Sequence, residues 1–135
     1  SLAEFHGRLY IIWLVNRYRI VKERYSKLCS ENQNLLCPKI NNERIYFNYR
    51  GIKHLIEKRG GTRSLEQIYS RTRLFKHCRE IICSSDANVE FRSHTYGDKE
   101  IKYWGLSKVI NNRTKVTIVI RKIGKGKIHF YSIFK

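Results

Sequence analysis

The sequence predicts an α+β fold in which N-terminal helices pack on a curved antiparallel sheet of three to five strands. Two observations lead to this class. Apolar residues recur at helical spacing in the N-terminal part of the chain, whereas segments after Asn88 alternate between apolar and polar residues. With 135 residues, of which 41% are hydrophobic, the chain is long enough for one core and short for two.

The first predicted helix runs from about Leu9 to Leu28. Its apolar stripe has alternating spacings of three and four residues and consists of Ile11, Leu14, Tyr18, Val21, Tyr25 and Leu28. Two interpretations stay open: the helix packs on its own domain, or residues 9–28 contact a second chain or connect to a larger protein. Because Pro38 marks the entry to a second segment, we divide the chain into a helical extension, residues 1–37, and a domain, residues 38–135.

The middle of the chain predicts short elements. Arg44–Asn48 is a strand candidate, and Lys53–Lys58 follows as a short helix. Ser64 and Gln67 have the spacing of a capping box, which predicts that a helix begins there. The apolar positions between Leu65 and Cys83 are interrupted, so we expect two helices in this region.

The C-terminal part predicts antiparallel strands. Turns are expected at Asn111-Asn112 and at Gly124-Lys125-Gly126, the second between strands Lys115–Ile123 and Lys127–Phe134. Strict alternation along the last strand would place its residues on two faces. One face would hold His129, Tyr131 and Ile133, and the other Ile128, Phe130, Ser132 and Phe134.

The charge of the chain is strongly basic. There are 28 Lys and Arg residues against 11 Asp and Glu, a formal net charge of +17. Residues 1–37 hold 6 basic and 3 acidic residues and residues 38–135 hold 22 and 8, so most of the excess lies after Pro38. Such an excess favours association with a polyanion. A nucleic acid is the expected partner, and an anionic membrane surface or an acidic protein is the alternative.

Several site classes are disfavoured by the residue pattern. The carboxylates are scattered without DxD or HExxH spacing, so a metal-dependent nuclease, which needs clustered carboxylates, is not expected. The four cysteines show no CxxC spacing, and free thiols are expected, with a zinc site at His77, Cys78 and Cys83 as a weaker alternative. The apolar run Leu9–Val15 is too short for a membrane span, and it does not indicate a signal peptide.

RNA can be cleaved without a metal because its own 2′-OH attacks the adjacent phosphate. The reaction needs a base for the 2′-OH proton and cations for the phosphorane charge. His54 is the favoured base, since Lys53 and Lys58 beside it would lower its pKa and keep it neutral. A serine in an apolar strand, Ser132, is either a hydrogen-bonded core hydroxyl or a phosphate ligand. Cations would come from Arg71, Arg73, Arg121 and Lys122.

These residues resemble a known family. The Lys53-His54 pair and the Ser132-Ile133-Phe134 ending resemble the colicin D-type tRNase domain, within the wider group of barnase–EndoU–colicin–RelE-like (BECR) nucleases. The resemblance covers residues 38–135 and depends on the order of several short motifs. It implies a BECR/RelE-like version of the predicted fold.

The family motif carries over residue by residue. It reads Lys-x-Lys-His early and Ser-x-Trp late, and it assigns the second lysine to Lys53, the histidine to His54 and the serine to Ser132. Phe134 stands at the tryptophan position, where it can stack on a base. Gly51 stands at the first lysine position, so the charge would have to come from elsewhere. The candidates for that charge are Lys58, Arg59 and Arg73.

The resemblance implies metal-independent cleavage of tRNA to a 2′,3′-cyclic phosphate, with no cofactor. It also implies a toxin that acts in the cytoplasm, is delivered from another cell as the C-terminal domain of a larger secreted protein, and is neutralised by an acidic immunity protein or antitoxin. The expected catalytic residues are Lys53, His54, Arg73, Arg121 and Ser132. The expected substrate-binding residues are Lys58, Arg59, Arg71, Lys122 and Phe134.

Two other function classes stay open. One is cleavage of ribosome-bound mRNA, as in RelE-like members. The other is a non-catalytic module, either an RNA-binding surface that uses some of the nine tyrosines and two tryptophans or a protein-interaction domain that uses residues 9–28.

Overall fold

The computed structural model describes residues 17–135. Its α-helices are α2 Arg19–Glu31, α3 Tyr49–Ile56, α4 Leu65–Thr72 and α5 Cys78–Ile82, and two 3-10 turns lie at Pro38–Ile40 and Phe75–His77. Its long strands are β5 Asn88–Tyr96, β6 Lys99–Ile110, β7 Thr114–Ile123 and β8 His129–Phe134. Four short strands precede them: β1 Leu35–Cys37, β2 Glu43–Ile45, β3 Glu57–Lys58 and β4 Gly61–Thr62.

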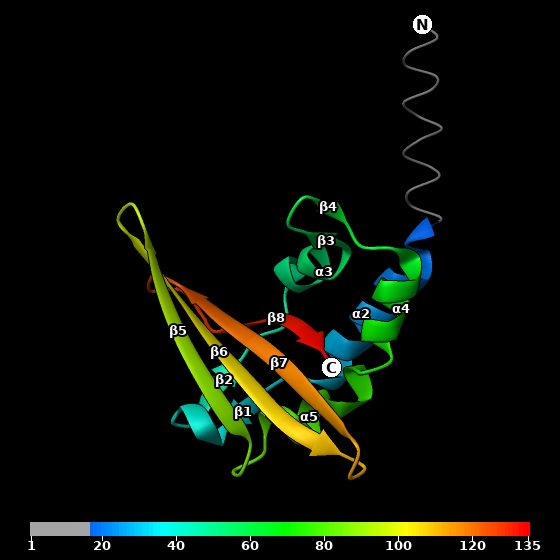
Figure 1. The fold of residues 1–135 in the computed structure, drawn as a ribbon. Coiled ribbons are helices and arrows are strands. Elements are labelled where there is room, and N and C mark those ends of the chain that lie inside the picture. Colours follow the sequence, from blue (N-terminus) through cyan, green and yellow to red (C-terminus); the bar gives the residue numbers. More distant parts are fainter. Residues whose placement is uncertain (1–16) are drawn as a thin grey trace, which may run out of the picture.

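The four long strands form one antiparallel sheet in the order β5-β6-β7-β8. The helices lie to one side of the sheet and the β5–β6 hairpin projects away from them (Figure 1). The predicted α+β class, with helices first and antiparallel strands after them, is therefore confirmed, with four strands in the main sheet.

The two predicted hairpin turns of the sheet are also confirmed. Asn111 and Asn112 join β6 to β7 with φ of 54° and 59°, the left-handed conformation that asparagine tolerates in tight turns. Gly124 begins the turn between β7 and β8 with φ of 55°. These turns fix the strand register.

The predicted start of α4 is correct, whereas the predicted boundaries of α3 are wrong. Ser64 and Gln67 form the expected capping box at the start of α4, and α4 and α5 are the two helices expected between Leu65 and Cys83. The prediction of a helix over 53–58 was wrong at both ends. Asn48 caps α3 by accepting a hydrogen bond from the Arg50 amide, so the helix begins earlier. It ends at Ile56 because the next two residues pair with β4.

The small hairpins among the helices were not predicted. The strand expected at Arg44–Asn48 is instead β2, which ends at Ile45 and pairs with β1. Tyr46 makes only an isolated bridge to His129, the first residue of β8. This bridge joins the N-terminal half of the chain to the edge of the main sheet.

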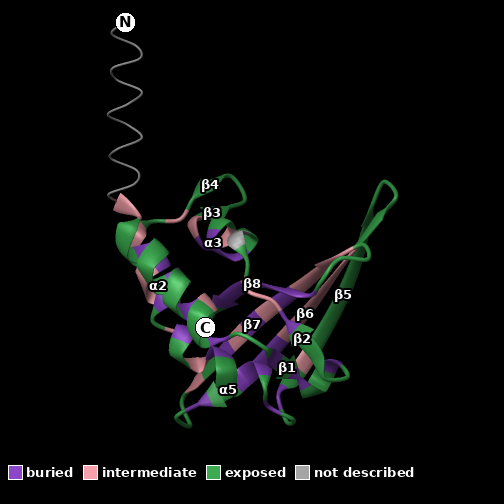
Figure 2. Ribbon diagram, turned by 180° about the vertical axis from the view of Figure 1, so that it is seen from behind, coloured by how far each residue is buried: buried purple, intermediate pink, exposed green. Residues whose placement is uncertain are grey.

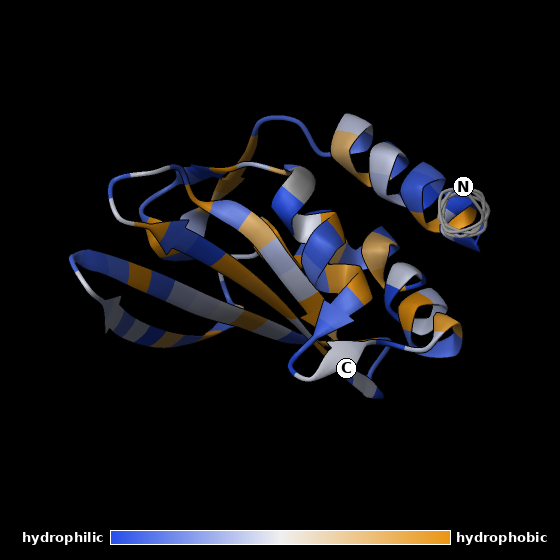
Figure 3. Cartoon of the chain, turned by 90° about the horizontal axis from the view of Figure 1, so that it is seen from above, coloured by the Kyte–Doolittle hydropathy of each residue, from blue (hydrophilic) through white to orange (hydrophobic). Residues whose placement is uncertain are grey.

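Helix α2 belongs to the same core as the sheet. Val21, Tyr25 and Leu28 are buried in one cluster with residues of the later helices and of the sheet, as expected for a helix that packs on its own domain. The remaining apolar positions of the predicted stripe, Ile11 and Leu14, lie outside the described residues. Because Cys37 of β1 pairs with Glu43 of β2, the expected boundary after residue 37 falls inside a hairpin. In Figure 3, α2 and α4 carry hydrophobic and hydrophilic residues on different faces.

The core is centred on Phe130 of β8. The centroid of its ring lies 5.3 Å from that of Phe47, 6.3 Å from that of Tyr25 and 6.4 Å from that of Phe75. Such ring pairs add to the free energy gained from burial. Most residues of β8 are buried, whereas β5 at the opposite edge is exposed along most of its length (Figure 2).

Candidate functional site

The site is built on a β-bulge in strand β8. Phe130 pairs with Ile120 and Ser132 pairs with Val119, so Tyr131 is the extra residue between them. Since Ile118 and Ile120 are buried, Phe130 and Ile133 point into the core, while Ser132 lies on the opposite face with Val119. The strict alternation expected for this strand was therefore wrong. The bulge places Tyr131 and Ser132 on the same open face of the sheet.

His54 of α3 lies against this bulge. Its ring stacks on the ring of Tyr131, with 3.8 Å between the centroids and 19° between the planes. The guanidinium of Arg121 on β7 lies 4.2 Å from the centroid of the same tyrosine ring. The three side chains come from different elements and form one cluster, which we call the His54 cluster.

The electrostatic environment keeps His54 neutral. Burial is the largest cause, and the positive charges of Arg63, Arg71 and Arg121 add to it, which together lower the pKa of His54 to about 4. Burial also raises the pKa of Tyr131, so its phenol stays protonated at neutral pH. The imidazole therefore has a free lone pair at physiological pH, as a proton acceptor requires.

Arg71 of α4 joins the helices to the end of β8. Its Nη1 donates to Ser132 Oγ at 2.9 Å and to the Ile133 carbonyl at 3.2 Å, and its guanidinium lies 5.7 Å from the Phe134 ring centroid. Burial, together with nearby Arg63, lowers the pKa of Arg71 to about 10, so it remains cationic at pH 7. Ser132 is 7% exposed and is a hydrogen-bonded hydroxyl that orients this arginine.

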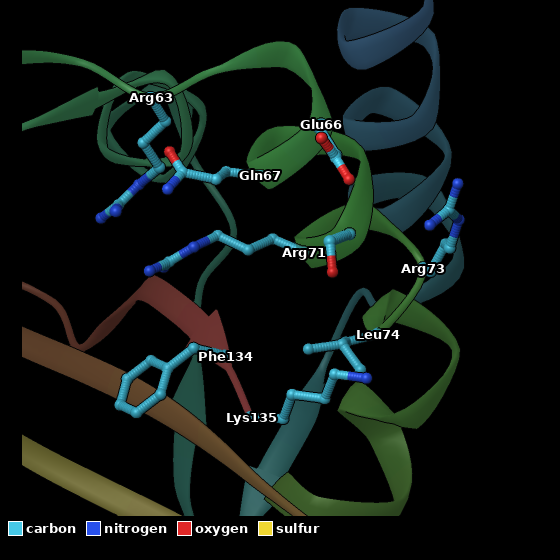
Figure 4. A pocket seen from close by; sticks show the side chains of 9 residues that line it. Arg63, Glu66, Gln67, Arg71, Arg73, Leu74, Phe134 and Lys135 are labelled. Atoms are coloured by element: carbon cyan, nitrogen blue, oxygen red, sulfur yellow. The ribbon is translucent and has the colours of Figure 1, made fainter.

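Arg63 is the second cation beside the His54 cluster. Its Nε is buried and has no hydrogen-bond partner within residues 17–135. In Figure 4 the side chains of Arg63 and Arg71 extend in the same direction, away from α4. The ion pairs formed within residues 17–135 lie elsewhere, at Lys27–Glu31, His77–Glu80 and Lys108–Asp86. In this part of the chain, neither Arg63 nor Arg71 forms an ion pair with a carboxylate, which leaves two neighbouring cations available for an anion.

Arg121 is positioned by His129 at the start of β8. Its Nε donates to His129 Nε2 at 3.2 Å, and His129 Nδ1 lies 3.4 Å from the Lys127 carbonyl. Both contacts are satisfied by the neutral tautomer with the proton on Nδ1. Burial first, and then the charge of Arg121, lower the pKa of His129 to about 4.

Three hollows of the surface meet at β8. The His54 hollow is lined by Arg50, Lys53, His54, Glu57, Lys99, Arg121, Ile123 and Tyr131. The α4 hollow, drawn in Figure 4, is lined by Arg63, Glu66, Gln67, Ser70, Arg71, Arg73, Leu74, Phe134 and Lys135. The sheet-face hollow is lined by Glu90, Arg92, His94, Tyr103, Gly105, Thr117, Val119, Tyr131 and Phe134. Tyr131 and Phe134 each line two of the three.

The residues expected from the sequence fall into two groups. Lys53, His54 and Arg121 line one hollow, and Ser132 is joined to the α4 hollow through Arg71. Phe134 lies between the α4 hollow and the sheet face. The remaining expected residues lie further out.

That outer group comprises four cations. Lys122 pairs with Lys102 and alternates to the face of β7 opposite Arg121. Lys58 and Arg59 are exposed at the β3–β4 turn. Arg73 lines the α4 hollow, but its side chain points away from Arg71 in Figure 4.

The glycine at the first lysine position of the family motif has a packing reason. Gly51 is buried in α3, and a Cβ there would overlap the Tyr25 hydroxyl and lie 2.9 Å from Phe130 Cδ1. A lysine does not fit at this position. Arg63 and Arg71 instead place positive charge near His54, and both lower its pKa.

Sequence reasoning missed Arg63, Tyr103 and Tyr131. Tyr131 was expected on the face of β8 opposite Ser132, and only the bulge brings the two together. Arg63 precedes the capping box of α4 and carries no motif of its own. A signal for Tyr131 was available, because alternation along the last strand already places it on the face of His129. The pairing of Tyr103 with Arg121 depends on the strand register, which residue numbers alone do not give.

No metal site is formed by the described residues. Within residues 17–135 no group of three or more His, Cys, Asp or Glu side chains lies close enough to hold a metal ion. Cys29, Cys37, Cys78 and Cys83 are all free thiols. Burial raises the pKa of the Cys78 thiol, which therefore behaves as a core residue.

Comparison of the chain with family models, with curated proteins and with solved structures returned no match. Of the helices in the described region, none is both long and apolar enough to cross a membrane. Function therefore has to be argued from the site itself.

Proposed function

We propose that the protein is a metal-independent endoribonuclease that cleaves RNA by attack of a 2′-OH on the adjacent phosphate. The observation that carries the proposal is His54, a neutral histidine stacked on Tyr131 with three arginines close enough to lower its pKa. This reaction requires a neutral base that accepts the 2′-OH proton and cations that stabilise the charge on the phosphate.

The proposed roles follow from the positions of the side chains. His54 takes the 2′-OH proton, the 2′-oxygen forms a bond to phosphorus, and the bond to the 5′-oxygen breaks. Lys53, which lines the same hollow, donates a proton to the leaving 5′-oxygen. Arg121 and the Arg63–Arg71 pair stabilise the charge that develops on the phosphate oxygens. The products are a 2′,3′-cyclic phosphate and a 5′-OH.

A base with a pKa of about 4 is weak, and substrate binding is expected to strengthen it. A phosphate bound among the arginines cancels part of their charge and thereby raises the pKa of His54 in the complex. The acid limb of kcat reports the complex and that of kcat/KM reports the free protein. The proposal therefore expects the limb of kcat at a higher pH than the limb of kcat/KM.

The substrate and the biological setting rest on the resemblance to colicin D-type domains. We propose tRNA as the substrate, a BECR/RelE-like relationship for the fold, and an acidic immunity protein or antitoxin as the partner that covers the site. In this proposal the chain acts in the cytoplasm after delivery from another cell as part of a larger toxin. Ribosome-bound mRNA is the competing substrate, and cleavage of tRNA without ribosomes separates the two.

A non-catalytic RNA-binding module is the second candidate, favoured by the aromatic and basic side chains on the open sheet face. The two are separated by incubating total tRNA with the protein in EDTA. Nuclease function predicts cleavage that His54→Gln reduces by at least about a hundredfold, within the range of a general base. Binding of RNA without cleavage would favour the second candidate.

A further inference from the structure

A chain of aromatic rings crosses the open face of the main sheet. It starts at His54, which stacks on Tyr131, and continues to Tyr103 of β6 with 5.6 Å between the centroids. From Tyr103 it passes to His94 of β5 at 6.0 Å and then to Tyr96 at 6.3 Å. The rings therefore connect the His54 cluster to the exposed β5–β6 hairpin.

Arginines flank the centre of this chain. Tyr103 pairs with Arg92 on one neighbouring strand and with Arg121 on the other. Directly paired residues of adjacent strands lie on the same face of a sheet, so a cation stands on each side of the tyrosine. Neither arginine forms an ion pair with another of the described residues. Alternating rings and guanidinium groups suit a ligand that alternates flat bases and phosphates.

The sheet-face hollow lies next to these rings. Gly105 of β6 lines it, and a Cβ there would meet only ordinary contacts, at 3.8 Å from Thr117 Cγ2 and 3.9 Å from the Glu90 carbonyl oxygen. A larger side chain would therefore fit at position 105, and lack of space does not explain the glycine. A glycine in a strand interior costs stability and is typical of a position where a ligand comes close to the backbone.

We infer that this face is a binding platform for unpaired nucleotides, with one base stacked on Tyr103 and a second in the hollow at Gly105, while His54 and Arg121 already cover the ring of Tyr131. The inference rests on the proposed nuclease function and deepens it, because it names a single-stranded segment of the RNA as the part that is held. A base in a duplex is already stacked on its neighbours and does not present its face to a protein ring.

The opposite face of the same strands supplies a matched control. Phe91 of β5 pairs with Trp104 of β6, and their ring centroids lie 5.4 Å apart. Phe91 is 53% exposed, so it is an accessible aromatic side chain one residue from Arg92 and on the other face of the sheet. If removal of any exposed aromatic side chain weakened RNA binding, substitutions on both faces would have the same effect.

The test measures binding to a short RNA strand that carries 2′-O-methyl groups throughout, alone and annealed to its complement. These groups block attack by the 2′-oxygen, so binding is separated from cleavage. Fluorescence anisotropy at fixed salt gives the affinities of the full chain and of Tyr103→Ala, Tyr103→Phe, Gly105→Leu and Phe91→Ala. Thermal melting identifies any variant that does not fold, and Gly105→Leu tests the same face without removing a ring.

The platform predicts that the single strand binds at least about tenfold more tightly than the duplex, and that Tyr103→Ala and Gly105→Leu each weaken single-strand binding about tenfold. Tyr103→Phe and Phe91→Ala are expected to bind like the wild type. Equal affinity for single strand and duplex would overturn the inference. So would equal losses in Tyr103→Ala and Phe91→Ala, or a surface that binds an acidic protein and no RNA. If the nuclease function fails, tRNA is not cleaved while the preference for single strands remains.

Discussion

Replacing His129 by glutamine tests the electrostatic basis of the site through the pH dependence of stability. His129 is 3% exposed, and its Nε2 accepts a hydrogen bond from Arg121 Nε. Protonation of Nε2 would remove that acceptor and place two cations together. A glutamine at this position keeps an acceptor and does not titrate between pH 4 and 8.

The expected magnitude follows from the pKa values. An unfolded histidine titrates near 6.5, whereas burial and Arg121 lower the pKa of His129 in the folded protein to about 4. Between these values the unfolded chain binds a proton that the folded protein does not, so stability falls as the pH falls. From pH 7.5 to pH 5.0 this one group is expected to cost about 1–2 kcal/mol of unfolding free energy.

The assay is urea unfolding of both proteins across this pH range. With a typical slope for small proteins, the wild-type midpoint should fall by about 1 M more than the midpoint of His129→Gln between pH 7.5 and 5.0. Other titrating groups are common to both proteins and cancel in the comparison. If both lose the same free energy, the histidine is not held neutral by its surroundings and the reasoning is refuted.

Three further changes probe the packing and the anion site. Gly51→Ala should lower the unfolding free energy by about 1–3 kcal/mol in chemical denaturation, because its Cβ would overlap the Tyr25 hydroxyl; unchanged stability would contradict that contact. Ser132→Ala removes the oxygen that receives Arg71 Nη1 and should reduce kcat about tenfold with little change in the melting temperature, and activity equal to wild type would exclude this positioning role. Ser64→Ala should cost about 1 kcal/mol through loss of the α4 cap without changing the pH dependence of activity, and a shifted pH profile would contradict a purely structural role.

Local signals made most of the fold predictable from the sequence. The capping residues Ser64 and Gln67 and the turn at Asn111-Asn112 act on their own neighbourhood, and both are found where they were expected. Short hairpins such as β3–β4 depend on pairing between only two residues on each side, which leaves no periodic pattern in the sequence.

The site was less predictable because it depends on contacts between distant segments. His54 was identified from its basic neighbours, whereas its stacking on Tyr131 requires α3 to pack on β8, a contact that no local pattern reveals. Arg71 and Ser132 are far apart in the sequence, and their hydrogen bond follows from the position of α4 against the sheet edge. A one-residue bulge also changes which face a serine occupies, and alternation alone does not reveal it.

The central claim is that His54 takes a proton from a 2′-OH of the RNA. The most direct test is a tRNA cleaved in EDTA, followed by the same tRNA with a single 2′-deoxy substitution at the nucleotide before the cleaved bond. The proposed mechanism predicts a 2′,3′-cyclic phosphate on the first substrate and loss of that cut on the second, with His54→Gln inactive on both. Cleavage of the substituted bond, or full activity of His54→Gln, would contradict it.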